Sequence, residues 1–185
     1  MNLSTVKEKL EAAGVAFDKG LTEREIQLVE QSFRFSFPPD LKALLMFALP
    51  CGKSWPNWRN LEDPQIEVMM SWPTEGICFD IENNGFWPET WGTKPESLDQ
   101  AFEVANQKVS AAPKLIPIYG HRYLPDRPSI EGNPVFSVYQ TDIICYGSNL
   151  WRYFQNEFQY PSEGKSLQLD EPLRRIEFWS DLVFD

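Results

Sequence analysis

The sequence predicts an α+β fold, with helices packed around a mostly antiparallel sheet in a single domain of residues 1–185. Helical patterns with start and stop signals fill the N-terminal part, short runs rich in β-branched and aromatic residues follow residue 114, and helical patterns return near the C-terminus. Segregated helices and strands are typical of α+β folds. A chain of 185 residues can bury a core of its own without disulfide bonds.

The first 50 residues contain three helix signals. Leu3 to Ala13 is predicted to form the first helix. Thr22 and Glu25 form a capping box at the start of the second, and Pro39 suits the first position of the third. Apolar spacing here and further along the chain predicts a core containing Ile26, Val29, Leu41, Leu44, Leu45, Phe102, Ile118 and Val138.

The middle of the chain is predicted to hold a helix, a strand and a second helix. Residues Pro64 to Ser71 suit a short helix that Pro73 ends. The stretch "GICFDIENNGFW" (76–87) alternates weakly and contains an Asn-Gly turn signal, which indicates a strand leading into a turn. Ser97 to Ser110 has helical apolar spacing.

The C-terminal third is predicted to form the sheet. The stretches "KLIPIY", "PVFSVYQ" and "TDIICYG" are rich in residues that favour strands. The segment from Gly120 to Pro134 is too long for a tight hairpin, so we expect a loop that is either functional or packed down. Two short helices are predicted in "NLWRYFQNEF" and "LRRIEFWSDLV".

Negative charge concentrates in one segment of the chain. The formal net charge is −10, and the residues from Glu62 to Glu103 contain ten carboxylates and one base, Lys94, for a net charge of −9. The same segment carries three tryptophans and three phenylalanines. Acidity disfavours nucleic acid as a direct partner, because that binding depends on Lys and Arg. The segment is either a solvated acidic face over an aromatic core or a surface for a basic partner.

Cysteine usage and the N-terminus predict a cytoplasmic protein. Cys51, Cys78 and Cys145 are far apart and odd in number, which favours reduced thiols over a disulfide framework. The first 14 residues carry four charges and no apolar run, unlike a signal peptide. The longest apolar stretch, Ala43 to Pro50, is too short to span a bilayer, so no membrane association is expected.

Motifs for catalysis are mostly missing from the sequence. The single histidine, His121, excludes a multi-histidine metal site, and no P-loop, G-x-S-x-G elbow or G-x-G-x-x-G loop occurs. We expect no cofactor and no bound metal. For His121 we favour a structural role, as a neutral imidazole that pins its loop through backbone carbonyls, because the adjacent Arg122 disfavours protonation.

Two catalytic arrangements are conceivable. His121 could pair with Cys145 or Cys78, but both cysteines lie in predicted strands, where a thiol is usually inert. Asp80 and Glu82 would share one face of a strand and could perform glycosidase-type acid–base chemistry. Carboxylates at that spacing are common on solvated strands, so we expect a protein that is not an enzyme.

The stretch "LTEREIQLVEQSFRFSFPPDLKALLMFALPCG" (21–52) resembles the N-terminal signature of the SMI1/KNR4 family, in the SUKH superfamily. The signature combines a capped helix with a central Glu, here Glu30, a Pro-Asp-Leu helix entry at residues 39–41, and a turn glycine, here Gly52. The family's usual Asn-Gly turn is Cys51-Gly52 in this chain. "WPNWRN" (55–60) is similar to the family's aromatic loop, and "LIPIYG" and "NPVFSVYQTD" are similar to its later strands.

The resemblance implies an α+β fold with helices around a curved sheet, and no enzymatic activity. It implies a bacterial immunity protein that binds and neutralises a polymorphic toxin, often a nuclease or a deaminase. An acidic, tryptophan-rich segment agrees with this, because it would complement a toxin domain with a basic surface. The expected partner-binding residues are Trp55, Trp58, Asp80, Glu82, Trp87, Glu89 and Trp91.

Two alternatives stay open. The chain could be an intracellular scaffold or regulator, as fungal members of the family are, or an enzyme that uses an acid pair such as Asp80 and Glu82. The missing catalytic motifs favour the two binding functions over the enzyme.

Overall fold

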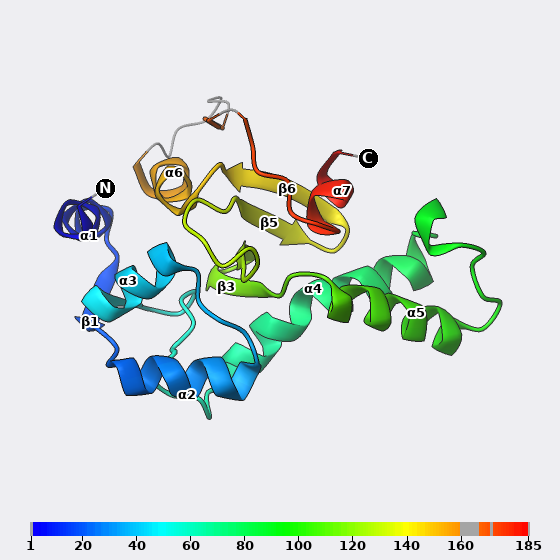
Figure 1. Ribbon diagram of the computed structural model, residues 1–185, viewed down its shortest axis with the longest axis horizontal. Coiled ribbons are helices and arrows are strands. Elements are labelled where there is room, and N and C mark those ends of the chain that lie inside the picture. The colour runs from blue at the N-terminus through cyan, green and yellow to red at the C-terminus, as the bar shows by residue number, and fades with distance from the viewer. Residues whose placement is uncertain (1, 160–166, 171, 185) are drawn as a thin grey trace.

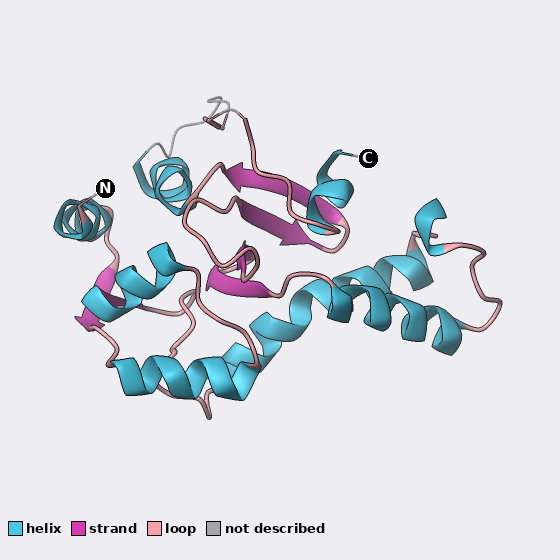
Figure 2. Ribbon diagram, viewed as in Figure 1, coloured by secondary structure: helices cyan, strands magenta, loops and turns pink. Residues whose placement is uncertain are grey.

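The computed structural model describes residues 2–159, 167–170 and 172–184, and these residues form the predicted α+β fold (Figure 1). Their helices are α1 (Leu3–Ala12), α2 (Glu23–Phe33), α3 (Pro39–Phe47), α4 (Pro64–Asn83), α5 (Leu98–Ala111), α6 (Leu150–Phe154) and α7 (Trp179–Phe184), with a 3₁₀ turn η1 (Glu89–Trp91) and a π-helical turn η2 (Gln155–Gln159). The strands are β1 (Ala16–Lys19), β2 (Ala48–Cys51), β3 (Leu115–Tyr119), β4 (Arg122–Pro125), β5 (Val135–Tyr139) and β6 (Asp142–Gly147). Within the described residues β1 pairs with β2, β3 to β6 form an antiparallel sheet in chain order, and Figure 2 shows both sheets in magenta.

The four-stranded sheet has a hydrophobic core on each face. Ile116 and Leu124 belong to a core shared with α1, α2, α3 and α6, whereas their neighbours Leu115 and Tyr123 belong to a second core shared with α4, α5 and α7. Neighbouring residues of a strand point to opposite faces, which explains why the strands are apolar almost throughout. The predicted core positions are buried, except Phe102, which is half-buried.

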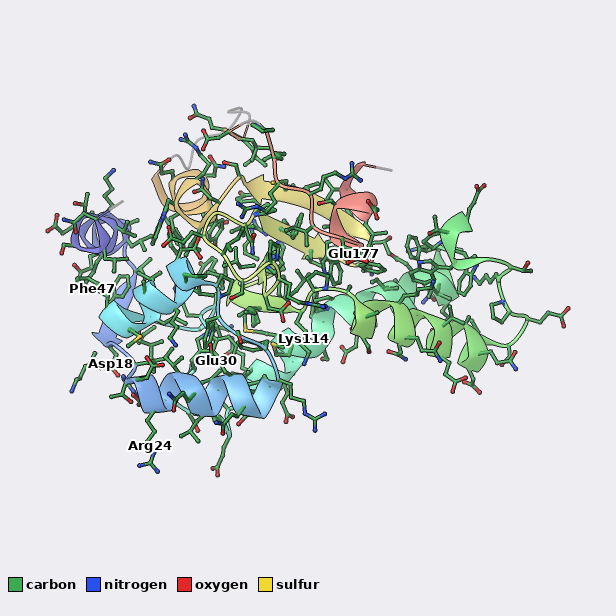
Figure 3. The ribbon with its side chains drawn as sticks, viewed as in Figure 1. Asp18, Arg24, Glu30, Phe47, Lys114 and Glu177 are labelled. Carbon is green, nitrogen blue, oxygen red and sulfur yellow. The ribbon has the colours of Figure 1, made fainter. Side chains whose placement is uncertain are left out.

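The N-terminal helices form where the sequence predicts them. The capping box is present, because the Thr22 hydroxyl accepts from the Glu25 backbone N–H and the Glu25 carboxylate accepts from the Thr22 backbone N–H. The Glu30 carboxylate accepts a hydrogen bond from the Phe37 backbone N–H at 2.9 Å. In Figure 3 Glu30 lies on the side of α2 that faces α3, whereas Arg24 points away from the molecule. Glu30 therefore holds the turn between α2 and α3.

Helix α4 corrects the prediction for the middle of the chain. The predicted short helix, its end at Pro73 and the predicted strand over 76–87 are replaced by one helix, Pro64–Asn83, that runs through Pro73. Its buried positions follow helical spacing at Ile66, Met69, Pro73, Ile77, Asp80 and Ile81. Pro73 has no N–H for the Met69 carbonyl one turn earlier, and the Tyr123 hydroxyl donates to that carbonyl instead, at 2.8 Å.

The segment from Gly120 to Pro134 is packed down and contains a strand, β4, that the sequence analysis missed. The side-chain amide of Asn133, which is fully buried, donates to the carbonyls of Pro125 and Pro128. Asp40 at the start of α3 accepts from the Gly132 backbone N–H at 3.1 Å. These contacts show that the segment is packed down, which was the second of the two expectations.

The first predicted short helix of the C-terminal part is present as α6, and the second is present only in its later half, because α7 begins at Trp179 and residues 173–178 are not helical. The carboxylate of Glu157 in η2 pairs with the buried Arg122 of β4 at 3.1 Å, and the Arg122 guanidinium lies 4.0 Å from the centre of the Tyr146 ring. The small β1–β2 sheet was not predicted, because its strands are only four residues long.

Candidate partner-binding face

Two of the predicted partner-binding residues lie in the core. Trp58 is 1% exposed and packs edge-on against Phe33, Phe35 and Phe37, with ring centres 5.4 to 6.0 Å apart. Trp55 is also buried and its ring lies 4.9 Å from that of Tyr119. Neither side chain can be a surface anchor, so the aromatic loop at 55–60 is a structural element.

Asp80 and Glu82 do not form the predicted pair. They lie on a helix rather than a strand, so positions two apart point to different sides. Asp80 is buried and accepts from the backbone N–H of Thr141, at 2.9 Å, from the Thr141 hydroxyl and from the Asn84 amide. Burial alone raises the pKa of Asp80, but the hydrogen bonds from Thr141 and Asn84 outweigh it and lower the pKa. Asp80 therefore ties the β5–β6 turn to α4, and Glu82 is exposed.

Trp87 and Trp91 form a small aromatic cluster at the far end of α4 and α5. Both are half-buried, their ring centres are 5.3 Å apart, and Trp91 stacks on Phe178. The Trp87 indole N–H donates to the Gly92 carbonyl at 2.7 Å, which closes the turn around η1. Their shared packing gives both tryptophans a structural use, whereas Glu89 beside them is exposed.

The acidic segment coincides with a helical arm, defined here as α4, α5 and their connection at 84–97. The arm projects from the rest of the molecule in Figure 1. Most of its carboxylates are exposed: Glu67, Glu75, Glu82, Glu89, Glu96, Asp99 and Glu103. Lys94, the one base between Glu62 and Glu103, donates to the carbonyl of Ile81 near the end of α4. The arm therefore presents negative charge that is hardly neutralised by Lys or Arg residues of the same segment.

One face of α4 combines exposed apolar and acidic side chains. Val68, Trp72, Glu75, Phe79 and Glu82 follow one another at steps of four or three residues, which places them on one side of the helix. All five are exposed, and Phe79 is 47% exposed in spite of its large apolar side chain. We call these five residues the α4 stripe. Sequence reasoning missed it because the strand prediction hid the helical spacing.

The α4 stripe borders the β4–β5 region of the sheet. The Trp72 indole N–H donates to the Val138 carbonyl at 3.3 Å, and the Trp72 ring lies 6.5 Å from that of Tyr139. Tyr139 is 58% exposed and its ring also lies 6.5 Å from that of His121. Gly76 makes this approach possible, because a Cβ there would lie 2.7 Å from the Cα of Gln140. Trp72, Tyr139 and His121 therefore form a half-open aromatic surface beside α4.

Two hollows flank Trp72 on this surface. One, of about 300 Å³, is lined by Gln65, Val68, Met69, Trp72, Gly120, His121 and Tyr123. The other, of about 190 Å³, is lined by Trp72, Glu75, Gly76, Phe79, Tyr139 and Gln140. Both are at or below the lower end of the range for small-molecule pockets, so their size suits single side chains of a partner.

The predicted structural role of His121 is corrected in its details. The imidazole is exposed, and among the described residues no hydrogen bond joins it to a backbone carbonyl; it contacts the edge of Tyr139 instead. Partial desolvation of the ring by the groups around it, followed by the Arg122 charge, lowers the pKa of His121. Cys145 is buried in β6, whereas Cys78 lies on α4 and not in a strand, and burial raises its pKa.

No family model, no curated protein and no solved structure matches this chain. The described residues contain no group of three or more His, Cys, Asp or Glu placed to hold a metal ion. Within the same residues, none of the helices combines the length and the apolar character that crossing a lipid bilayer requires.

Proposed function

We propose that this chain is a protein-binding domain, and in particular an immunity protein of the SMI1/KNR4 type that neutralises a toxin domain with a basic surface. The observation that carries the proposal is the α4 stripe, where the exposed side chains of Trp72 and Phe79 alternate with those of Glu75 and Glu82. A basic protein partner can bury exposed aromatic side chains and can pair its Lys or Arg residues with the neighbouring carboxylates.

The charge of the helical arm supports a nuclease or deaminase as the target. Such toxins hold polyanionic nucleic acid, so their active sites are lined by cations. An acidic arm competes with nucleic acid for the same cationic side chains. Its negative charge also speeds the encounter with the toxin. Helix α4 itself contains no Lys or Arg, so its surface offers no internal partner to Glu75 or Glu82.

The test is protection of cells from a toxin. The chain is expressed together with each of a panel of nuclease and deaminase toxin domains, including any encoded beside its own gene, and growth is measured. We expect full protection against one domain, and loss of protection when Glu75, Glu82 and Glu89 are all changed to Lys. The matched control reverses Glu8, Glu131 and Glu177, which are exposed outside the arm, and changes the net charge equally.

Each outcome decides between defined alternatives. Equal loss of protection in both triple variants would mean that total charge matters and the arm does not. Binding to a basic protein without protection against any toxin would favour the scaffold alternative. Failure to protect and to bind any member of the panel would overturn the proposal.

A further inference from the structure

The two hollows beside α4 are lined by equivalent positions of the helix. Gln65, Val68, Met69 and Trp72 line the first, and Trp72, Glu75, Gly76 and Phe79 line the second, so each position of the second lies seven residues after its counterpart. Seven residues of an α-helix rise by about 10.5 Å. The surface therefore offers two sockets, about 10 Å apart along α4, on either side of the Trp72 ring.

We infer that this surface binds a basic amphipathic helix, which inserts apolar side chains at positions i and i+7 into the two sockets. The inference deepens the proposed function and rests on it, because it names the element of the partner that is recognised. Residues i and i+7 of a helix lie on one face and about 10.5 Å apart, which matches the spacing of the sockets.

Other backbone conformations fit this surface less well. In a β-strand about 10 Å corresponds to three residues, and residues three apart point to opposite faces. A polyproline II segment has the right period, but its backbone makes no internal hydrogen bonds and needs donors when it docks. The Trp72 indole N–H already donates to the Val138 carbonyl, and the Gln65 amide already donates to the Lys53 carbonyl at 2.6 Å, which leaves the His121 imidazole, the Tyr139 hydroxyl and the Gln140 amide as donors beside the sockets for an unpaired backbone. The backbone N–H and C=O groups of a helix are already hydrogen-bonded to one another, so a docked helix needs no backbone donors from this surface.

Charge decides between a different partner and a second copy of this chain. Glu75 and Glu82 lie within the α4 stripe, and Glu67 and Asp142 are exposed nearby on α4 and β6. Two copies packed through this face would bring these carboxylates together in a desolvated interface, which is unfavourable. Lys or Arg residues beside the anchors of a foreign helix would instead meet opposite charges.

The experiment selects peptides against the whole chain. A displayed library holds a 21-residue helical scaffold at fixed length and randomises its exposed positions, and a second library displays random linear peptides of the same length. We expect enriched helical sequences with apolar residues seven apart and flanking Lys or Arg. Phe79→Glu should weaken their binding at least tenfold, whereas Leu28→Glu, at a site on α2 that is equally exposed (46% against 47%), should not.

Several results would overturn the inference: enrichment of proline-rich or strand-like sequences, helices with another anchor spacing, binding that survives Phe79→Glu, or no enrichment at all. Sedimentation of the wild-type chain and of Phe79→Glu tests self-association, and a dimer that the substitution dissolves would assign the face to a second copy. Failure here is distinct from failure of the proposed function. Toxin protection that persists in Phe79→Glu would leave the function standing, and peptide selection without protection would do the reverse.

Discussion

Several carboxylates of this chain hold loops in place. Buried Asp40 accepts from the backbone N–H groups of Leu41 and Gly132, and buried Asp126 accepts from that of Lys114 at 2.8 Å. A buried carboxylate without partners would be costly, and these bonds reduce that cost. Burial nevertheless raises the pKa of Asp40 and of Asp126. Their charge therefore serves the fold, unlike the exposed charge of the helical arm.

Glu25 should make the free energy of unfolding depend on pH. Hydrogen bonds from the backbone N–H and hydroxyl of Thr22, and then from Arg59, lower the pKa of Glu25 to about 2. A carboxylate with a lowered pKa stabilises the fold above its unfolded pKa, about 4.3, and this contribution disappears as the pH falls towards 2. Glu25→Gln should therefore lower the free energy of unfolding at pH 7, and the difference from wild type should shrink between pH 4.5 and pH 2.

Urea unfolding at a series of pH values measures this difference. Glu8→Gln is the control, because Glu8 is exposed on α1 and makes no hydrogen bond or ion pair with the described residues. A gap between Glu25→Gln and wild type that stays constant down to pH 2 would contradict the assigned pKa.

Tryptophan burial shows what the sequence could and could not predict at this scale. The seven tryptophans indicate a large aromatic contribution to the core or to an interface, but not which residue serves which. Trp58 lies in a polar-looking loop, yet the phenylalanines that enclose it come from residues 33–37. Trp72 lies in a mostly apolar stretch, yet it is exposed. These placements depend on tertiary contacts that no local pattern encodes.

Helix α4 explains why the predicted partner-binding residues had to be revised. Pro73 predicts a helix end, and the alternation of Ile77, Phe79 and Ile81 predicts a strand. The fold overrides both signals, because Tyr123 satisfies the carbonyl that Pro73 leaves free, and Ile77 and Ile81 share a buried helical face. The starts of α2, with its capping box, and of α3, with Pro39 at its first position, were predicted well, because their signals are local. Strand β4 was missed because its four residues, RYLP, include Arg and Pro and give no apolar strand pattern.

The Tyr123 hydroxyl should contribute measurably to α4. Tyr123→Phe leaves the buried Met69 carbonyl without a donor, and we expect it to lower the free energy of unfolding by about 1–3 kcal/mol. Pro73→Ala supplies a backbone N–H to the same carbonyl. The loss caused by Tyr123→Phe should therefore be smaller in a Pro73→Ala background than in wild type.

Chemical denaturation of the four proteins in this double-mutant cycle gives the coupling between Tyr123 and Pro73. Tyr139→Phe is the control, since the Tyr139 ring is mostly exposed, and it should change stability by less than about 0.5 kcal/mol. Additive effects of the two core substitutions would show that the Tyr123 hydroxyl does not replace the missing bond.

The whole molecule separates its structural and its electrostatic parts. The two cores lie on the faces of the sheet, and the buried sides of α4 and α5 belong to the second core; most exposed carboxylates of the acidic segment lie on the solvent-facing sides of the same arm (Figure 1). Charge on a projecting element acts on an approaching partner without destabilising the core. The acidity of the segment is read directly from the sequence, but its projection from the sheet depends on how α4 and α5 pack together.

Salt should therefore affect how fast a basic partner associates. Exposed charges are screened over about 8–10 Å at physiological ionic strength, so the rate of association with a basic partner should fall as salt rises. Phe79→Ala should mainly speed dissociation, because it removes an apolar anchor. Stopped-flow kinetics at several salt concentrations measures both rates. An association rate that does not depend on salt would mean that the arm does not steer the encounter.

The exposed position of Trp72 also has an optical consequence. Trp55, Trp58 and Trp179 are buried, so their fluorescence should not respond to contacts at the surface. Trp72 is 39% exposed between the two sockets, and a docked helix would move its indole from water into an apolar environment. Its emission should then shift to the blue, and a Trp72→Phe chain should lack that shift. Trp72 would thus serve as an intrinsic reporter for occupancy of the proposed binding face, readable without any label.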